Sequence, residues 1–258
     1  MSWASRRQFS YLFIFFLIVG LIVFAFIYPI IFKKPTCTDN KKNGTETGID
    51  CGGSCLKVCE ADAFEPSVLW SRAFPVTGNI YNLVALVDNQ NKNSGSKEVA
   101  YEFRVYDTTN KLIGRRQGST FLSPNKQTAV FESRFDSGEM KIRSVVFEFV
   151  PPYNWVKIEP TLDLLPISVD RVLWDETAID PTLTARIKND SIYDISALDV
   201  VAIVYDINKN AINASKTYRE NLMSNGTSSV IFTWPEDLDR ASVTEDILLQ
   251  INPFTVSF

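Results

Sequence analysis

All four cysteines of this 258-residue chain lie in one short polar stretch, from Cys37 to Cys59. Cysteine sulfurs can bind a metal, perform redox chemistry or form disulfides, and the spacing C-x13-C-x3-C-x3-C helps to separate these uses. Structural zinc sites use two separated close pairs of ligands, often with histidine, and thioredoxin-like redox centres use C-x-x-C. Neither pattern occurs here. We therefore predict disulfides among Cys37, Cys51, Cys55 and Cys59, with three pairings open.

The polar residues between the first two cysteines suit calcium as well. Counting Asp39 as the first position of an EF-hand loop places Asn43 at the fifth, Gly44 at the sixth and Asp50 at the twelfth. Lys41, at the third position, cannot coordinate a cation, and the twelfth position normally holds the longer Glu. A plain polar loop shaped by turn geometry is the alternative. Calcium bound by Asp39, Asn43 and Asp50 is therefore a hypothesis, and no other cofactor is expected.

The composition argues against catalysis and against nucleic-acid binding. The chain contains no histidine, which removes the commonest general base and the commonest transition-metal ligand. Nucleophile-elbow, phosphate-loop and dinucleotide-binding motifs are missing too. With 26 basic and 30 acidic residues the formal charge is −4, so the electrostatic footprint of a nucleic-acid-binding protein is missing. We predict that the protein is not an enzyme.

An apolar segment precedes the cysteines. Residues 9–32 contain 24 residues without a charge, more than the roughly 20 that a helix needs to cross a bilayer. The segment is longer than the apolar region of a cleaved signal peptide, no small-x-small cleavage site follows it, and a buried core helix is seldom apolar all round. We predict an uncleaved transmembrane signal anchor that contacts membrane lipid, preceded by a cytoplasmic tail at residues 1–8.

Two opposed signals bear on the orientation of this anchor. Two arginines precede the span and four lysines follow it, so the positive-inside rule alone does not place the C-terminal side outside. These cations are Arg6, Arg7, Lys33, Lys34, Lys41 and Lys42. Disulfides persist in oxidising compartments, and the N-terminal tail is short. We predict that residues 35–258 lie outside the cell membrane.

The rest of the chain repeats itself at an offset close to 100 residues. VDNQN from Val87 aligns with IKNDS from Ile187, RVYDTTNKLI from Arg104 with IVYDINKNAI from Ile203, and FLSPNKQTAVF from Phe121 with NLMSNGTSSVI from Asn221. Three blocks in the same order at a nearly constant offset indicate a tandem duplication. We place the two copies at residues 64–160 and 166–258, after a cysteine-rich module at residues 35–60.

Both copies show the period of two that β-strands produce. Residues 83–88 alternate between a face with Leu83, Ala85 and Val87 and a second face, which predicts one face in a core and one in solvent. Turn-forming pieces such as DTTN, DINKN and LSPN separate these segments. We predict an all-β ectodomain of two tandem immunoglobulin-like antiparallel β-sandwiches, with one N-terminal transmembrane α-helix and a small disulfide-stapled module.

Four tryptophans lie near predicted strand ends. Trp70 and Trp174 occur in similar VLW contexts near the start of each copy, at an offset of 104. We expect each to close the end of a sandwich core, because aromatic side chains bury large areas. Stacking on a carbohydrate is the alternative, and the same two interpretations apply to Trp155 and Trp234.

Two local patterns resemble known families. FRVYD at residues 103–107 is similar to the FxLYD-type and related immunoglobulin-like extracytoplasmic domains, and AIVYD at residues 202–206 departs from it by an alanine in place of the aromatic residue. CTDNKKNGTETGIDCGGSC resembles the C-x-D-G-x-x-N-x-x-E-T-x-x-D-C-G-G-x-C element of bacterial and archaeal secreted and cell-surface proteins. Asn40 stands where glycine is usual, and the last cysteine comes one residue late. The resemblance implies β-sandwiches of unassigned function on a prokaryotic membrane-anchored envelope protein, and no ligand.

We therefore expect a single-pass membrane protein that presents its sandwiches for binding or scaffolding of a protein or glycan outside the membrane. The alternatives are an accessory subunit of an envelope or surface-appendage complex and a calcium-dependent adhesin. A long uncovered edge strand would favour the subunit, and a concave groove with clustered aromatics the adhesin. Four triplets, at Asn43, Asn189, Asn213 and Asn225, are candidate glycosylation sites.

Overall fold

The structure is a computed structural model that describes residues 3–31, 34–158, 166–175, 178–235, 238 and 243–255. Its described residues form two compact units, one up to Cys55 and one from Leu56 onward. Several predicted positions lie outside the described residues, namely Phe32 at the end of the predicted span, Lys33 after it, and the outermost residues of the predicted tail and of both predicted sandwiches.

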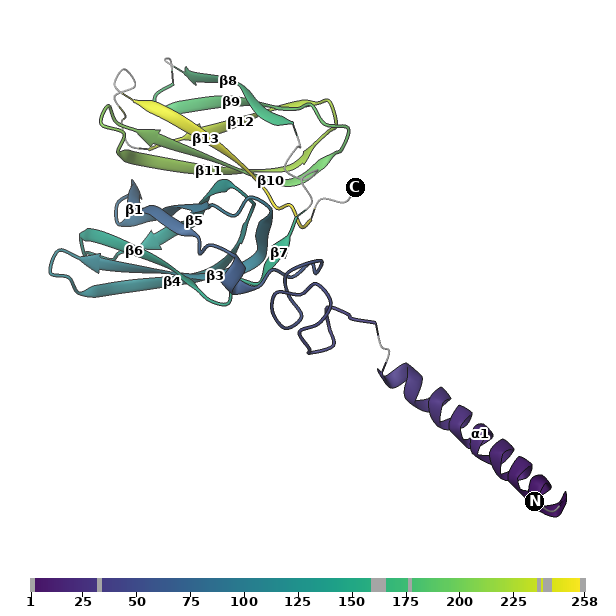
Figure 1. The fold of residues 1–258 in the computed structure, drawn as a ribbon. Helices are drawn as coiled ribbons and strands as arrows, with labels where there is room; N and C mark the ends of the chain where they lie inside the picture. Colours follow the sequence, from purple (N-terminus) through teal and green to yellow (C-terminus); the bar gives the residue numbers. More distant parts are fainter. Residues whose placement is uncertain are drawn as a thin grey trace. The chain divides into compact units, whose positions relative to one another are not determined.

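The first unit begins with helix α1 (Trp3–Ile31), seen in purple in Figure 1. Its segment Gln8–Tyr28 has a mean hydropathy of 2.8 and is long and apolar enough to cross a membrane. Every residue from 8 to 28 is exposed within the protein, which rules out a buried core helix as its explanation. A helix satisfies its backbone hydrogen bonds internally, so this apolar surface suits a lipid environment.

The second unit consists of one short 3-10 helix, η1 (Glu60–Asp62), and of strands. In the described part of the chain these are β1 (Ser67–Thr77), β2 (Ile80–Asn89), β3 (Ser94–Asp107), β4 (Leu112–Leu122), β5 (Lys126–Asp136), β6 (Ile142–Val150), β7 (Trp155–Lys157), β8 (Ile167–Asp175), β9 (Thr182–Asn189), β10 (Ile195–Tyr205), β11 (Ala211–Leu222), β12 (Thr227–Thr233) and β13 (Thr244–Ile251). Neighbouring strands pair in antiparallel fashion throughout.

The strands form two sandwiches with the same strand order. The first sandwich pairs the sheet β1-β2-β5 with the sheet β4-β3-β6, and β7 extends the pairing of β3. The second sandwich pairs β8-β9-β12 with β11-β10-β13. Strands β1 to β6 therefore correspond one by one to β8 to β13 (Figure 1). The predicted fold class, two antiparallel sandwiches after one apolar helix and a disulfide-stapled module, is confirmed.

Each sandwich has its own apolar core between its two sheets. Leu83, Phe103 and Phe147 are buried in the first core, and Leu183 and Phe232 are buried in the second. Burying an aliphatic or aromatic side chain of this size stabilises the fold by about 1.5–3 kcal/mol. The alternating inward residues of the strands thus supply both cores without any disulfide between the sheets.

A third apolar cluster lies between the sandwiches. It joins the outer face of the sheet β1-β2-β5 to the outer face of the sheet β11-β10-β13, through Phe74, Val84, Leu86, Ala129, Val201, Ile203, Ala211 and Ala214. Hydrogen bonds among the described residues also cross the boundary between the sandwiches. The Arg72 guanidinium donates to the Ala211 carbonyl at 2.6 Å, and the Gln250 amide donates to the Ala129 carbonyl at 3.2 Å. The two sandwiches therefore pack as four sheet layers.

The prediction of a solvent face for residues 83–88 is wrong for most of that segment. All residues from Leu83 to Val87 are buried, because Val84 and Leu86 face the second sandwich. Residues 200–204 of β10 are fully buried as well. An unbroken apolar run, rather than alternation, is the pattern of a strand covered on both faces.

The segment that follows Cys55 packs against the first sandwich. Leu56 accepts a hydrogen bond from Lys157 N–H at 2.8 Å, and so pairs with β7. The Asn91 side chain binds both backbone groups of Phe64, with distances of 2.8 Å to its N–H and 2.7 Å to its carbonyl. The compact unit with the first three cysteines thus ends at Cys55, whereas the predicted module extends to residue 60.

Candidate functional site

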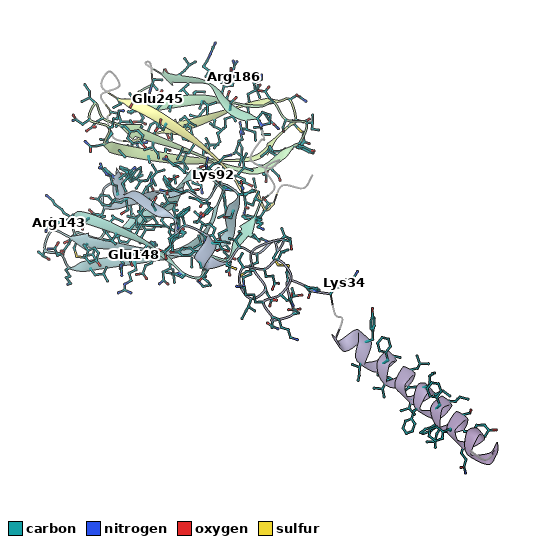
Figure 2. All side chains as sticks on the ribbon, in the orientation of Figure 1. Lys34, Lys92, Arg143, Glu148, Arg186 and Glu245 are labelled. Carbon is teal, nitrogen blue, oxygen red and sulfur yellow. A yellow bond between two sulfur atoms is a disulfide. The ribbon has the colours of Figure 1, made fainter. Side chains whose placement is uncertain are left out.

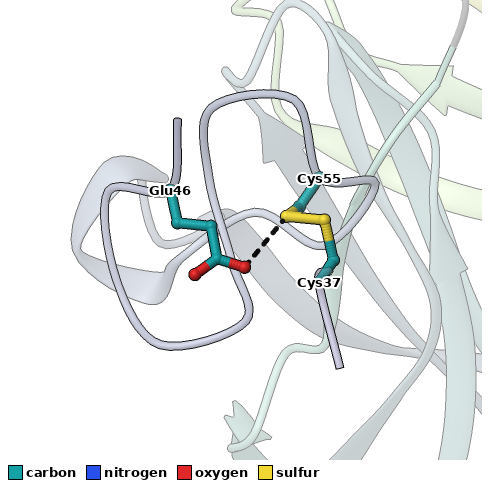
Figure 3. Close-up of side chains that lie close together, drawn as sticks. All are labelled: Cys37, Glu46 and Cys55. Atoms are coloured by element: carbon teal, nitrogen blue, oxygen red, sulfur yellow. Dashed lines mark hydrogen bonds between the residues drawn. A yellow bond between two sulfur atoms is a disulfide. The ribbon is translucent and has the colours of Figure 1, made fainter. Parts of the chain in front are cut away.

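The cysteine module is closed by disulfides. Cys37 and Cys55 form one, with their Cα atoms 5.7 Å apart. Cys51 and Cys59 are disulfide-bonded too, so the predicted use of all four sulfurs is confirmed. Figure 3 shows that the Glu46 carboxylate lies beside the first bridge, with Oε1 3.5 Å from Cys55 Sγ. A disulfide sulfur has no proton to donate and no thiolate for zinc, so this cluster is a packing contact and not a metal site.

In this module, carboxylate side chains accept the backbone hydrogen bonds that carbonyl groups accept in helices and sheets. Three of them accept hydrogen bonds of 3.0–3.1 Å from backbone N–H groups, in the pairs Asp39 with Lys41, Glu46 with Asn43, and Asp50 with Asn40. Backbone donors outside helices and sheets need such acceptors, and a charged acceptor makes the bond stronger. The acidic residues of the motif therefore fix the course of the loop.

Of the three predicted calcium ligands, Asp39 and Asn43 contact each other, whereas Asp50 binds the backbone N–H of Asn40. Asn43 Nδ2 donates to Asp39 Oδ2 at 2.8 Å, and this bond is the main reason that the pKa of Asp39 lies below its ordinary value. Asn43 Oδ1 is buried without a hydrogen-bond partner within the described residues. Calcium binding would require the Asn43 amide to turn so that its oxygen faces Asp39, and Asp50 to release Asn40. The calcium hypothesis stays a prediction with these stated requirements.

Two of the four predicted glycosylation sites are wrong, because their side chains are buried. Asn189 is 0% exposed, and its Nδ2 donates to the carbonyls of Tyr193, Leu222 and Met223 at 2.8–3.1 Å. Asn213 is 4% exposed in strand β11. A glycan bonded to either Nδ2 would have no room in the folded protein. Asn189 and Asn213 are instead buried parts of the second sandwich.

The other two triplets stay predictions. Asn225 is exposed in the turn between β11 and β12, where its φ of 51° is left-handed and its N–H donates to the Ser191 carbonyl at 3.1 Å. Asparagine tolerates this backbone conformation better than most residues. Asn43 is half-buried, and its amide nitrogen is already bonded to Asp39. Turn geometry accounts for both asparagines without a glycan.

A charged network covers the outer face of the sheet β4-β3-β6. Arg104 forms an ion pair with Glu148, which Figure 2 labels on this sheet, and approaches Glu102 to 3.8 Å. Arg115 lies 3.9 Å from Glu102, and Gln117 donates to it at 2.6 Å. Glu102 and Arg104 are partly buried, whereas their partners Glu148 and Arg115 are exposed, and pairs with an exposed partner add little stability, typically about 0–1 kcal/mol. The face is therefore a hydrated end of the four-layer stack.

The opposite end of the stack, the sheet β8-β9-β12, is also polar. Strand β9 carries Thr182, Thr184, Arg186 and Lys188 on its outer face, in register with β8 and β12. Arg186, labelled in Figure 2, forms an ion pair with Asp170. Two exposed apolar residues flank Thr184 on the neighbouring strands, Leu173 at 55% and Ile231 at 60% exposure.

Three of the four tryptophans lie in the cores, as expected. Trp155 and Trp234 are both 2% exposed and belong to the first and second core. Trp174 packs on Trp234 with ring centroids 5.4 Å apart, and its indole N–H donates to Glu245 at 3.2 Å. These contacts favour packing over carbohydrate stacking.

Trp70 is the exception. It packs beside Phe74, at a centroid distance of 6.2 Å, in the cluster between the sandwiches. The strand register explains the difference, because Trp174 is paired with Leu183, whereas the equivalent Leu83 is paired with Ala73. Trp70 is thus three residues away from the position equivalent to Trp174. An odd shift along a strand places the side chain on the opposite face.

Strand β4 forms an uncovered edge. It pairs with β3 from Leu122 to Leu112, and within the described residues no strand pairs with its other side. Two glycines let aromatic rings lie against its backbone. A Cβ at Gly114 would lie 2.6 Å from the Phe135 ring, and one at Gly118 would lie 2.5 Å from the Tyr101 hydroxyl. These rings fix the strand from below and leave its outer edge free.

Tyr101 also forms a polar contact beneath this edge. Its hydroxyl donates to the Glu132 carboxylate at 2.6 Å. Burial, followed by this carboxylate, raises the pKa of Tyr101 above its ordinary value. The phenol therefore stays protonated and works as a fixed hydrogen-bond donor between β3 and β5.

Two hollows in the described residues are small. The hollow beside the Cys37–Cys55 bridge measures about 160 Å³, and the one between the sandwiches near Pro124 and Pro253 about 70 Å³. Small-molecule sites commonly occupy ~300–1,000 Å³.

No protein-family model and no curated protein matches this chain. Among solved structures, the red sea bream transglutaminase is 12% identical, with a TM-score of 0.24 over 74% of this chain and 30% of that chain. A GH2 beta-galacturonidase from Eisenbergiella tayi bound to glycerol is 10% identical, with a TM-score of 0.22 over 72% of this chain and 41% of that chain. The chain thus spans less than half of each. Similarity at this level carries no argument about activity.

Proposed function

We propose that the chain is a non-enzymatic, single-pass membrane protein that acts outside the cell membrane as a scaffold or accessory subunit. Its paired sandwiches would offer strand β4 to an extended strand of a protein partner. The observation that carries this proposal is the free edge of β4, which is 11 residues long. A strand edge exposes a row of backbone N–H and C=O groups that a partner strand can pair with.

The helix and the disulfides together support the proposed location. Helix α1 supplies a segment of suitable length and hydropathy for a membrane anchor. Both disulfides require an oxidising compartment, which favours the exterior for the residues after the span. The four-layer packing supports a scaffold role, because the buried cluster between the sandwiches makes them one body. A partner held on β4 would therefore keep a fixed position relative to the whole ectodomain.

We also infer that the two sandwiches arose by duplication and belong with the FxLYD-type immunoglobulin-like domains. The shared strand order supports this inference. A buried asparagine at the end of the second strand of each copy supports it as well. Asn89 donates to the carbonyls of Ser94 and Ser123, and Asn189, 100 residues later, donates to three carbonyls of the corresponding loops.

Site-specific photocrosslinking in the native membrane tests the strand-addition proposal. A photoreactive residue replaces Gln117 or Ser119, both exposed on β4. We expect both positions to yield adducts with one protein partner, identified by mass spectrometry. The matched control is Thr184, on the outer face of the central strand β9, which has neighbours on both sides. Equal yields of that partner from Thr184 and from β4 would contradict the proposal.

A further inference from the structure

The cysteine module turns its acidic groups inward and its basic groups outward. Asp39, Glu46 and Asp50 all accept hydrogen bonds from the module's own backbone. Lys41 and Lys42 are exposed and form no ion pair with any described residue. The formal charges of the module nearly balance, but the carboxylates are engaged and the ammonium groups are available.

An exposed apolar side chain lies near these lysines. Both Asp50 oxygens bind Asn40 N–H, at 3.1 and 3.0 Å, and so hold the turn at Ile49 beside the turn at Lys41. Ile49 is 62% exposed. We call Lys41, Lys42 and Ile49 the module tip. Cationic side chains next to an exposed aliphatic residue are typical of protein surfaces that lie at a membrane interface.

The chain length places this tip within reach of the membrane surface. Helix α1 ends at Ile31, and Asn40 follows nine residues later, which corresponds to at most about 32 Å of extended chain. Lys34, also exposed, follows the helix by three residues. The disulfide between Cys37 and Cys55 keeps the module compact, so its residues cannot extend far from this attachment.

We propose that the module tip binds the anionic headgroups of the membrane that α1 crosses. The inference rests on the proposed membrane span. Lys41 and Lys42 would contact lipid phosphates that carry net negative charge, and Ile49 would enter the boundary between headgroups and acyl chains. This role gives a function to the lysines that follow the span on the side opposite to the positive-inside expectation.

Lipid photocrosslinking in nanodiscs tests the proposal with the full chain. A photoreactive residue at position 49 reports on lipid contact, in discs of phosphatidylcholine alone and in discs with an equal share of phosphatidylglycerol. We expect more lipid adducts in the anionic discs and a return toward the neutral level at high salt. The K41Q/K42Q variant should lower the adduct yield by roughly fivefold or more, because each lysine near an anionic surface contributes that order of affinity.

Two controls separate the module tip from general charge and exposure. K92Q/K97Q removes two exposed lysines of the first sandwich and should leave the yield unchanged. A photoreactive residue at Ile179, which is 100% exposed, should give few lipid adducts in either disc. If the chain stays in the discs but position 49 gives the same yield in neutral and anionic lipid, the headgroup proposal is overturned. Loss of the chain from the discs would overturn the membrane span itself.

Discussion

The two sandwiches have the same strand order, yet their outer faces have opposite characters. Glu102 and Arg104 lie on the exposed face of β3, whereas the equivalent residues of β10 are Val201 and Ile203, which are buried between the sandwiches. The equivalence follows from the registers, because Arg104 faces Arg115 on β4 as Ile203 faces Ala214 on β11. At these two positions, charged residues lie on the outer face of the sheet β4-β3-β6, and apolar residues bury the equivalent face of the sheet β11-β10-β13.

The other pair of sheets shows the reverse exchange. Val84 and Leu86 of β2 are buried against the second sandwich. Their equivalents in β9, Thr184 and Arg186, lie on the polar outer face. Apolar faces meet in the middle, and polar faces close both ends. As in repeat proteins, the terminal surfaces need polar residues to stop further stacking, while the fold of each unit stays the same.

The largest effect is expected from breaking the contact between the sandwiches. Val201→Glu places a carboxylate at a position that is 0% exposed, and the ammonium group of its cross-strand neighbour Lys216 is already paired with Asp199. An uncompensated buried charge costs about 3–5 kcal/mol. We expect the full chain to unfold in two separate transitions, one for each sandwich, where the unaltered protein unfolds in one. Denaturation followed by tryptophan fluorescence measures this.

Glu102→Gln is the matched control, because residue 102 occupies the equivalent position on the hydrated face. It should change the free energy of unfolding by less than about 1 kcal/mol. A single unchanged transition for Val201→Glu would show that the cluster between the sandwiches does not couple them.

The second largest effect is expected at Asn89 and Asn189, which occupy equivalent positions in the two sandwiches. Asn189→Ala removes the donor for three carbonyls in the loops around β9 and β11, and Asn89→Ala removes the donor for two in the first sandwich. We expect each to lower the free energy of unfolding by about 3 kcal/mol, because buried polar groups lose their partners. Urea denaturation measures the loss. Asn225→Gly, at an exposed left-handed position, should stay within about 0.5 kcal/mol of the unaltered protein. A loss in only one sandwich would contradict their equivalence at this position.

A smaller change in stability but a clear change in association is expected from converting the hydrated face. E102V/R104I gives β3 apolar residues like those of β10 and removes partly exposed ion pairs. The free energy of unfolding should change by less than about 1 kcal/mol, whereas the new apolar face should drive self-association. Light scattering on the detergent-solubilised chain measures the mass. The conservative variant E102Q/R104K should keep the mass of the unaltered protein, and association of both variants alike would argue against the role of the apolar face.

The smallest effect concerns the turns after β3 and β10. The pKa of Asp107 lies below its ordinary value of 3.8 mainly because the Thr109 hydroxyl donates to it, and that of Asp206 mainly because of Asn210 N–H. A lowered pKa in the folded state means that the stabilisation is present above the unfolded pKa and is lost as the pH falls through the folded pKa. Thr109→Ala should therefore raise the pKa of Asp107 toward 3.8 and leave that of Asp206 unchanged. Carbon-detected NMR titration of both carboxyl groups measures this, and equal shifts at both would refute the local cause.

The fold class is predictable from the sequence because period-two patterns and turn residues recur along both sandwiches. A different sequence pattern indicates the packing of the sandwiches on each other, namely the unbroken apolar runs at residues 83–87 and 200–204. Alternation within the first run predicts a solvent face only where a single layer covers the strand. Which surface covers the second face of β2 depends on contacts more than 100 residues away, which a local pattern cannot specify.

The candidate sites show the same limit. The cysteine spacing predicts disulfides, but the pairing of Cys37 with Cys55 depends on how the loop folds. The triplet at Asn189 matches a glycosylation pattern, although Asn89, at the equivalent end of strand β2, is an asparagine without the triplet. That recurrence indicates a role in the fold. The similar contexts of Trp70 and Trp174 misled in the opposite way, because an odd register shift changes the face while the local letters stay alike.

The clamp of Asn91 on Phe64 has a mechanical consequence for a tethered protein. With helix α1 held in a membrane as proposed, tension on the chain would reach the second unit ahead of strand β1. Because Asn91 holds both backbone groups of Phe64, at 2.8 and 2.7 Å, part of that tension passes into the loop between β2 and β3. Strand β1, which also carries Trp70 and Arg72 against the second sandwich, is thereby shielded from the pull. The Asn91 side chain, which lies outside the contact between the sandwiches, would thus protect that contact.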